Sequence, residues 1–579
     1  MRVVAGTFLT RVAVLGAVIG AAASAQTPVL PLSEVRPGMR GVGRTVFSGD
    51  RIEEFAVEVL GVLENIGPKQ SVILAKLSGG PLAHTGVMQG MSGSPVYFDG
   101  KLAGAVALAF SFSKDPIAGI RPIEEMLRVD QGGAPPARRL AEVRPASAIT
   151  WGETRLTEIA TPVSFAGFTQ RTLEHFGGQL RALGLEPRQG TSSGGKMAKP
   201  GNPAALKPGA MISVQLLSGD MAVGADGTVT HVDGKRVYAF GHRFLSVGET
   251  ELPFARSEVL TLMPNLSTSF KISSAREWMG TITQDRSAAI AGELGREANL
   301  APITISVANG KGAPVQRYRM SMVNDRFLTP LLVQMAVFSA IDATERTLGS
   351  STFALKGAIE FEGGTGPVRL DNVYAGDFNV PMQVSAGAAT PLAYALQSGF
   401  ANLRLKNVSL SLDAFDAKKQ FAIASVWTSK RQVRPGESIE IKTTLEGENG
   451  QEVVKSVSWQ APIGASPGPL YITVADGATT NLSEYRQFLT GRPHSAAQLV
   501  SFLNGLRGNA GAYVRIWRAQ SGYQVEGEDL PGPPPSVALV LGRQQNAAAT
   551  TSSKIAEMAF STGDFVVSGS KTIQVEVKD

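Results

Sequence analysis

Apolar and polar positions alternate with a period of two through the first part of the chain. Phe55, Val57 and Val59 are separated by polar or small residues, and short apolar runs follow at 72–77 and 102–110. Short runs of this kind, bounded by turn residues, indicate half-buried strands. Asp99-Gly100 stands between 96–98 and 102–110, and this pair favours the positive φ angles of a tight hairpin. The sequence therefore predicts a β-rich unit over residues 30–130, closed by a short helix near 122–129.

A second β-rich block follows, with helical segments on either side. Residues 211–324 carry further strands, one of which, 236–240, ends at Gly241-His242. Residues 169–185 have helical spacing, and 328–347 is apolar on most faces, which predicts a buried helix. A third helix is expected over 495–506, where Ser495 and Gln498 form a possible capping box.

The last third of the chain changes character. Residues 433–445 begin with a Pro-Gly turn and alternate, 470–474 reads as another strand, and 565–577 ends the chain as strand. These patterns favour a small β-sandwich. The predicted division is a signal peptide at 1–25, a serine-bearing β unit at 30–130, a linker with a helical insert at 131–209, a histidine-bearing β unit and helix at 210–349, a β-rich accessory region at 350–480, and a small α+β module at 481–579.

Composition narrows the class of protein. The chain has 579 residues, enough for three or four domains, and its 64 glycines and 33 prolines suit turn-rich β structure. It has no cysteine, which excludes disulfides, thiol catalysis and cysteine-based zinc sites. A formal charge of +6 over this length is too dilute to indicate a nucleic-acid partner.

The N-terminus has the pattern of a secretory signal. Arg2 and Arg11 precede an apolar stretch that ends at Ala23-Ser24-Ala25, a small-residue cleavage site. The alternative is an uncleaved anchor, although the apolar run after Arg11 is short for a spanning helix. No later run reaches spanning length. We therefore expect a secreted or periplasmic protein with no stable membrane span after signal cleavage.

The segment Gly90-Met91-Ser92-Gly93-Ser94-Pro95 is the strongest candidate for chemistry. Flanking glycines permit a sharp backbone that presents the Ser92 hydroxyl while the N–H groups of Gly90 and Ser92 converge as an oxyanion hole. Glycine and serine are also ordinary turn residues, so a simple tight turn is the alternative.

A serine nucleophile needs a base, and the chain has five histidines: His84, His175, His231, His242 and His494. His242 stands where an apolar strand breaks at glycine, a position from which a β scaffold presents a side chain at its rim. A partly buried strand-end histidine without function is the alternative reading.

Two segments carry a family resemblance. The first, GVMQGMSGSPVYFDGKLAGAVALAF, continues to DPIAGIRPIEEML and resembles the catalytic-serine segment of the SpoIVB peptidase family of chymotrypsin-like serine peptidases. The second, VYAFGHRFLSVGETELPFARSEV followed by GTITQDRSAAIAGELG, resembles the histidine segment. The resemblance covers roughly residues 36–130 and 208–325. It implies a chymotrypsin-like double β-barrel built from two separated segments, with Ser92 as nucleophile and His242 as general base.

The sequence departs from the family in two respects. The family places its histidine segment before its serine segment, whereas here Ser92 comes first. Residues 77–89 contain no Asp or Glu where the family carries an acidic residue. Asp285, in TQDRSAA, is the substitute for the third catalytic member, and a surface aspartate paired with Arg286 is its alternative reading. Asp233 and Glu249 are further candidates.

Two functions remain open. The first is an exported serine endopeptidase acting on protein or peptide substrates, and the second is a catalytically inactive relative that serves as an envelope binding or scaffold module. The sequence predicts no metal or cofactor, since it has no HExxH motif and no close histidine pair. It assigns no oligomeric state. If the fold is correct, residues 104–112 would line the specificity pocket, and their small apolar side chains favour an uncharged substrate residue.

Overall fold

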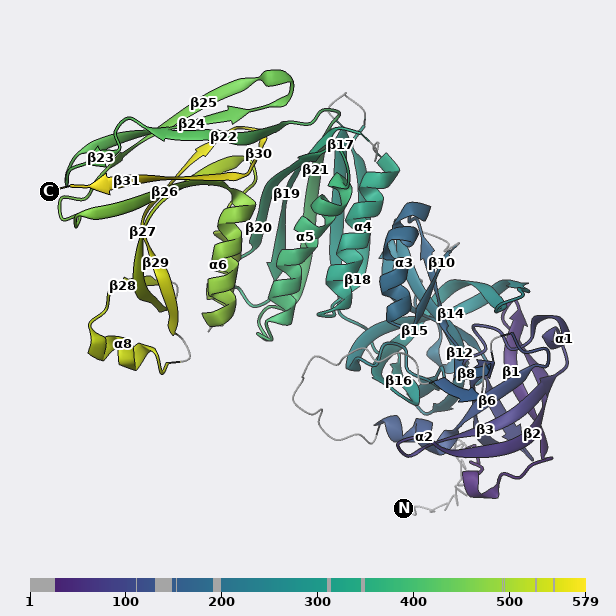
Figure 1. The fold of residues 1–579 in the computed structure, drawn as a ribbon. Coiled ribbons are helices and arrows are strands. Elements are labelled where there is room, and N and C mark those ends of the chain that lie inside the picture. Colours follow the sequence, from purple (N-terminus) through teal and green to yellow (C-terminus); the bar gives the residue numbers. More distant parts are fainter. Residues whose placement is uncertain are drawn as a thin grey trace, which may run out of the picture.

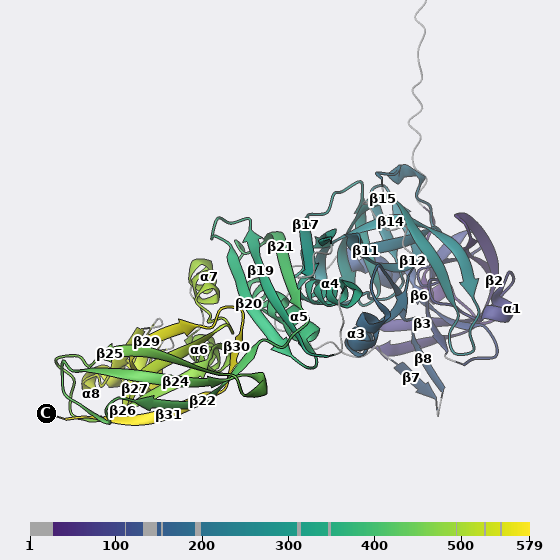
Figure 2. The same cartoon turned by 90° about the horizontal axis from the view of Figure 1, so that it is seen from above.

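The structure is a computed structural model, and it describes residues 27–578 except 111, 131–147, 152–153, 191–198, 310–313, 345–348, 492, 494, 526–527 and 545–546. The expected signal peptide lies outside the described residues. The architecture is mainly β, as the sequence predicts. Figures 1 and 2 show an elongated molecule, in which the N-terminal sheets and the C-terminal sheets lie at opposite ends with a helix-covered sheet between them.

The first sheet closes on itself. Its antiparallel strands run in the order β4-β1-β2-β3-β6-β5, and an additional β4–β5 pairing joins the two ends into a ring of six. We call this ring 1. Its core includes Phe55, Ile73, Val96 and Ile120. The members are β1 (Arg40–Ser48), β2 (Arg51–Gly67), β3 (Gln70–Ser78), β4 (Pro95–Phe98), β5 (Lys101–Phe110) and β6 (Ile117–Pro122), accompanied by α1 (Leu82–Thr85) and α2 (Ile123–Leu127).

A second ring of six antiparallel strands repeats this strand order. It runs β12-β13-β16-β15-β14-β11 and is closed by a β11–β12 pairing. Counted along the chain, the strands of each ring are adjacent in the order first, second, third, sixth, fifth, fourth. The members of ring 2 are β11 (Met211–Gly219), β12 (Ala222–Asp233), β13 (Arg236–Ala239), β14 (Gly248–Met263), β15 (Phe270–Arg286) and β16 (Ala289–Leu294).

The segment predicted to be a linker with a helical insert builds onto both rings. Strand β8 pairs with β5 of ring 1, and β9 pairs with β12 of ring 2. The helical insert is α3, which starts after Thr169, whose side chain accepts a hydrogen bond from the Thr172 N–H. Thr161–Ala166 is buried at five of its six positions, so it lacks the period of two by which the other strands were predicted. The elements are β7 (Ala148–Trp151), β8 (Thr154–Glu158), β9 (Thr161–Ala166), α3 (Gln170–Ala182) and β10 (Leu185–Gln189).

The sheet of ring 2 continues into a helix-covered sheet. Strand β18 pairs with β11, and the order continues β18-β17-β21-β19-β20. Figure 1 shows α4 and α5 on one face of these strands. The predicted buried helix is confirmed as α4, which is apolar around most of its circumference and packs in the largest core. The elements are β17 (Leu300–Asn309), β18 (Gln316–Val323), α4 (Leu328–Thr344), β19 (Ser351–Phe361), β20 (Val368–Gly376), α5 (Val380–Gln397) and β21 (Leu405–Phe415).

Two further sheets pack face to face at the C-terminal end and share one core, which includes Phe421, Ile439, Ile472, Val514 and Val575. The sandwich thus takes strands from both sides of the predicted boundary at residue 480, because the last strands of the chain return to complete it. Its strands are β22 (Gln420–Thr428), β23 (Gln432–Val433), β24 (Ser438–Glu446), β25 (Glu452–Gln460), β26 (Gly468–Asp476), β27 (Gly511–Val525), β28 (Glu528–Pro531), β29 (Ala547–Ser561), β30 (Val566–Ser568) and β31 (Ser570–Val577).

Two helices accompany this sandwich, α6 (Gly477–Gly491) and α8 (Pro535–Leu541), whereas α7 (Ala496–Asn504) packs in the core of the helix-covered sheet, against β20 and α5. The predicted cap of α7 is confirmed, since the Ser495 side chain accepts a hydrogen bond from the Gln498 N–H. Within the described part of the chain, no helix is both long and apolar enough to cross a membrane.

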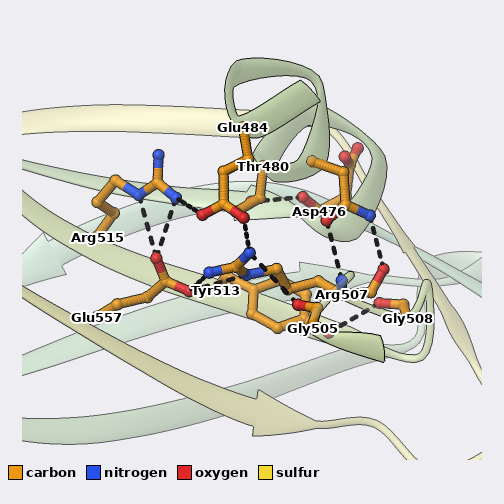
Figure 3. A network of polar contacts seen from close by, with 10 residues as sticks. Asp476, Thr480, Glu484, Gly505, Arg507, Gly508, Tyr513, Arg515 and Glu557 are labelled. Atoms are coloured by element: carbon orange, nitrogen blue, oxygen red, sulfur yellow. Dashed lines mark hydrogen bonds and ion pairs between the residues drawn. The ribbon is translucent and has the colours of Figure 1, made fainter. Parts of the chain in front are cut away.

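An ion-pair network fixes α6 to the sandwich (Figure 3). Arg515 donates to Glu484 Oε1 and to Glu557 Oε2, each at 3.0 Å. Arg507 donates to Glu557 Oε1 at 2.7 Å and also pairs with Glu484. These four side chains are only 17–22% exposed. The charges of two arginines and two glutamates therefore neutralise one another in a partly buried position.

We expect Glu557→Gln to destabilise the C-terminal sandwich by about 1–3 kcal/mol, because both arginines lose a charged acceptor. Hydrogen exchange of the β27 and β29 amides in increasing urea measures this loss locally. Glu452→Gln, at an exposed position of β25, is the control and should change stability by no more than about 0.5 kcal/mol. Equal effects of the two substitutions would show that the network does not stabilise the sandwich.

Candidate active site

The serine segment forms a loop between α1 and β4, after the third strand of ring 1. Gly90 and Gly93 have φ angles of +90° and +92°, a region that favours glycine. The N–H groups of Met91, Gly93 and Ser94 donate to backbone carbonyls. Those of Gly90 and Ser92 have no acceptor among the described residues. The predicted hairpin after the loop is confirmed as β4 and β5, with Asp99 and Gly100 at positive φ.

Ring 2 holds this loop through β12. The Thr228 N–H donates to the Ser92 carbonyl at 2.8 Å, and the Thr228 hydroxyl donates to the Gly90 carbonyl at 2.9 Å. The Thr230 hydroxyl donates to the Gly93 carbonyl at 2.7 Å. Thr228 and Thr230 lie two residues apart and so share one face of the strand. The backbone conformation of the serine loop is therefore fixed by the neighbouring ring.

His242 lies in the corresponding loop of ring 2, directly after its third strand, β13. The two loops are in contact. A Cβ atom added to Gly93 would lie 2.5 Å from the Phe240 nitrogen. One added to Gly241 would lie 3.3 Å from the Val106 carbonyl oxygen, which accepts the Gly93 N–H at 2.8 Å. A side chain at Gly93 would force backbone atoms to move, Gly241 is held at a φ of +69°, and the chain directly after β13 folds back against the serine loop.

The His242 imidazole is buried, with 2% of the residue exposed. Its Nδ1 lies 2.6 Å from the Arg243 carbonyl oxygen. Because a carbonyl only accepts, this contact assigns the proton to Nδ1 and leaves a lone pair on Nε2. Nε2 has no hydrogen-bond partner in the structure, and neither has the buried Oγ of Ser92. The two atoms lie on adjoining loops, each without a partner, and are not bonded to each other.

Burial lowers the pKa of His242, and the charges of Arg121 and Arg243 lower it further. The Glu158 carboxylate and the contact with the Arg243 carbonyl act in the opposite direction and raise it. Glu158 also forms a 3.3 Å ion pair with Arg243. The net effect favours the neutral imidazole, which is the form that can accept a proton.

Asp285 lies at the end of β15 and is 1% exposed, so the reading of it as a surface residue is wrong. Its carboxylate accepts the N–H groups of Phe244 at 2.8 Å, Leu245 at 2.7 Å and Val247 at 3.2 Å. Burial raises its pKa, and these N–H groups lower it. Asp285 therefore fixes the loop that follows His242. The hydrogen-bond partner of His242 Nδ1 is the Arg243 carbonyl and not Asp285.

Sequence reasoning missed Arg121, a buried residue of β6 that contacts the loop carrying His242. It is 2% exposed, its Nη1 lies 3.3 Å from Glu125, and its Nε lies 3.4 Å from the Gly241 carbonyl oxygen. Glu125 also accepts the Ser71 N–H at 2.7 Å. Arg121 and Glu125 are four residues apart, a spacing that allows an ion pair on a helix. The sequence RPIEE does not show, however, that the two side chains are buried.

A second buried pair, Lys271 and Asp226, lies beneath the serine loop. Lys271 Nζ donates to the Thr45 hydroxyl of ring 1 at 2.7 Å, and its side chain lies against Gly90. Ser164 donates to Asp226 at 3.4 Å. Burial lowers the pKa of Lys271 to about 7 and raises that of Asp226 to about 6. The two groups stabilise each other's charge, and no motif in the sequence reveals them.

The other described histidines lie in different surroundings. His84 is exposed in α1, His175 packs on Phe338, and His231 stacks on Tyr238. His494 lies outside the described residues. Within the part of the chain that the structure covers, no three His, Asp or Glu side chains gather closely enough to bind a metal ion.

A glycine-bracketed serine on one loop and an imidazole with a free lone pair on the contacting loop define a candidate serine-hydrolase centre between two β rings. Residues 10–127 match the SpoIVB peptidase S55 family. This match confirms the resemblance of the serine segment and indicates a serine peptidase; it ends before the His242 segment. No curated protein and no solved structure matches the chain.

Proposed function

We propose that the protein is an exported serine endopeptidase in which Ser92 is the nucleophile and His242 the general base. The observation that carries the proposal is the direct contact between the serine loop and the end of β13. The family match of the serine segment supports it. Under this proposal, the two closed rings are the two barrels of a chymotrypsin-like fold.

In the proposed reaction, Ser92 Oγ attacks a peptide carbonyl and transfers its proton to His242 Nε2. The N–H groups of Gly90 and Ser92 stabilise the oxyanion of the tetrahedral intermediate. The imidazolium then protonates the departing amine. In the second half of the reaction, His242 removes a proton from water, the water attacks the acyl group, and the proton returns to Ser92. The Arg243 carbonyl holds the Nδ1 proton throughout. Asp285, the third predicted member, acts by fixing the loop that carries the histidine.

The reversed chain order is compatible with this chemistry because the rings have the same strand order. Each catalytic loop follows the third strand of its ring. Exchange of the two loops between equivalent positions would leave the serine and the histidine facing each other, and triads are known in several chain orders. Export is proposed on the N-terminal sequence alone, and fractionation of expressing cells tests it by locating the protein with or without residues 1–25.

A catalytically inactive scaffold is the second candidate. The observation that favours it is the burial of Ser92, which has no exposed surface, together with the missing bond between its Oγ and His242. Catalytic hydrogen bonds often form only when substrate binds, so an activity measurement decides between the two.

The deciding experiment compares hydrolysis of an unstructured protein substrate by the wild type, Ser92→Ala and Ser94→Ala. Ser94 is the matched control, since its hydroxyl is equally buried and unpartnered. The endopeptidase requires activity in the wild type and in Ser94→Ala, and its loss in Ser92→Ala. Equal cleavage by all three, or none by the wild type, favours the scaffold.

The pH profile gives a separate prediction. kcat/KM should rise as His242 loses its proton, with a midpoint below the ordinary 6.5 because burial lowers the pKa. Glu158→Gln should move this midpoint to lower pH, since the Glu158 carboxylate raises the pKa and the charges of Arg121 and Arg243 remain. Rates measured from about pH 4 to 8 test the shift. An upward shift would rule out His242 as the titrating base.

A further inference from the structure

A cavity of about 180 Å³ lies beside His242. Three segments that are distant in the sequence surround it: residues 158–161 between β8 and β9, 183–186 at the start of β10, and 242–244. Two of these segments belong to residues 131–209, the stretch predicted to be a linker with a helical insert. The chain between the rings therefore builds the wall of a site next to the proposed general base.

The lining combines apolar side chains with charged residues that are paired with one another. Ile159, Leu185 and Phe244 contribute buried side chains, 5%, 2% and 3% exposed. The charged residues form two ion pairs, Glu158 with Arg243 at 3.3 Å and Arg181 with Glu186 at 3.4 Å. Each arginine is already paired with a carboxylate. A charged side chain of a ligand would therefore find no unpaired opposite charge among these four residues.

The size of the cavity restricts its occupant. Sites for cofactors and drug-sized ligands measure roughly 300–1,000 Å³, so this cavity is too small for them. It has room for one medium-sized side chain. His242 is itself part of the lining, so a side chain held there would lie next to the residue proposed as general base.

We propose that this cavity is a subsite that takes an uncharged side chain of leucine, methionine or phenylalanine size from a peptide substrate, next to the scissile bond. The inference rests on the proposed function. It differs from the expectation that residues 104–112 supply specificity, since none of those that the structure describes is in the lining of the cavity.

Filling the cavity tests the subsite. Ala160 is half-buried in its lining, so Ala160→Phe in the full-length protein should lower kcat/KM at least 10-fold for peptides with Leu, Met or Phe at one position beside the cut. Peptides with Ala or Gly there, and the rate of fluorophosphonate labelling, should change less than about twofold. Ala308→Phe, at a half-buried alanine of β17, is the control. An unchanged preference in Ala160→Phe, or a wild-type preference for charged residues, overturns the subsite.

A binding measurement separates the subsite from catalysis. Peptides that carry photo-leucine are crosslinked to the Ser92→Ala protein, and the adducts are mapped by mass spectrometry. Crosslinks at residues 158–161, 183–186 or 242–244 support the subsite even if the wild type hydrolyses nothing, in which case only the proposed peptidase function fails. Crosslinks confined to other segments overturn the subsite even if hydrolysis is observed.

Discussion

His242→Gln is expected to slow peptide hydrolysis by a factor on the order of 10⁴–10⁶, the range found when the base of a serine peptidase is removed. Glutamine can keep a hydrogen bond to the Arg243 carbonyl, but it cannot accept the Ser92 proton. Steady-state kinetics on a peptide substrate measure the loss. The effect should fall on kcat, because proton transfer occurs in the transition state and contributes little to binding.

His231→Gln is the matched control for this substitution. His231 is also largely buried and lies on β12, next to the strand that ends at His242. It makes no contact with the serine loop that the proposed mechanism uses. His231→Gln should therefore retain activity within about tenfold. A similar loss in both variants, or an unchanged rate in His242→Gln, would assign the base to another group.

Gly93→Ala should be the most damaging substitution to structure and activity together. Its Cβ would lie 2.0 Å from the Thr228 carbonyl oxygen and 2.5 Å from the Phe240 nitrogen, and both are backbone atoms that cannot rotate away. The φ angle of +92° adds strain. We expect a destabilisation of roughly 3–5 kcal/mol, together with loss of hydrolysis, because the two loops must move apart.

Gly100→Ala separates strain from steric conflict. Gly100 has a similar φ of +76°, but a Cβ there has nothing within 4 Å. Its cost should be about 1–2 kcal/mol, with activity retained. Urea unfolding and peptide hydrolysis of both variants give the comparison. Equal behaviour of the two variants would mean that the serine loop and the end of β13 do not need their close contact.

Local patterns predicted local structure well. The Asp99-Gly100 turn fixed the β4–β5 hairpin, the apolar circumference of 328–347 predicted α4, and Ser495 predicted the start of α7. Each depends on residues that are close in sequence. The extent of the sandwich was not predicted correctly. Strand β22 pairs with β30 near the end of the chain, and no local sequence pattern indicates such a long-range pairing.

The candidate site shows the same distinction. Ser92 and His242 were identifiable from glycine-rich motifs, because tight backbone turns demand glycine. Arg121 was not, because its burial depends on Glu125 and on the Gly241 carbonyl, which is 120 residues away. Asp285 was predicted as a third catalytic member, but its hydrogen bonds to the N–H groups of Phe244 and Val247 depend on how that loop folds.

The most direct test of the proposed centre is mass-spectrometric mapping of a fluorophosphonate adduct on the full-length protein. The proposed peptidase predicts a covalent phosphonyl group on Ser92 in the wild type and in Ser94→Ala. It predicts none in Ser92→Ala and a greatly slowed reaction in His242→Gln. An adduct on Ser94, or a wild-type protein that takes no label under conditions where a known serine peptidase is fully labelled, would contradict it.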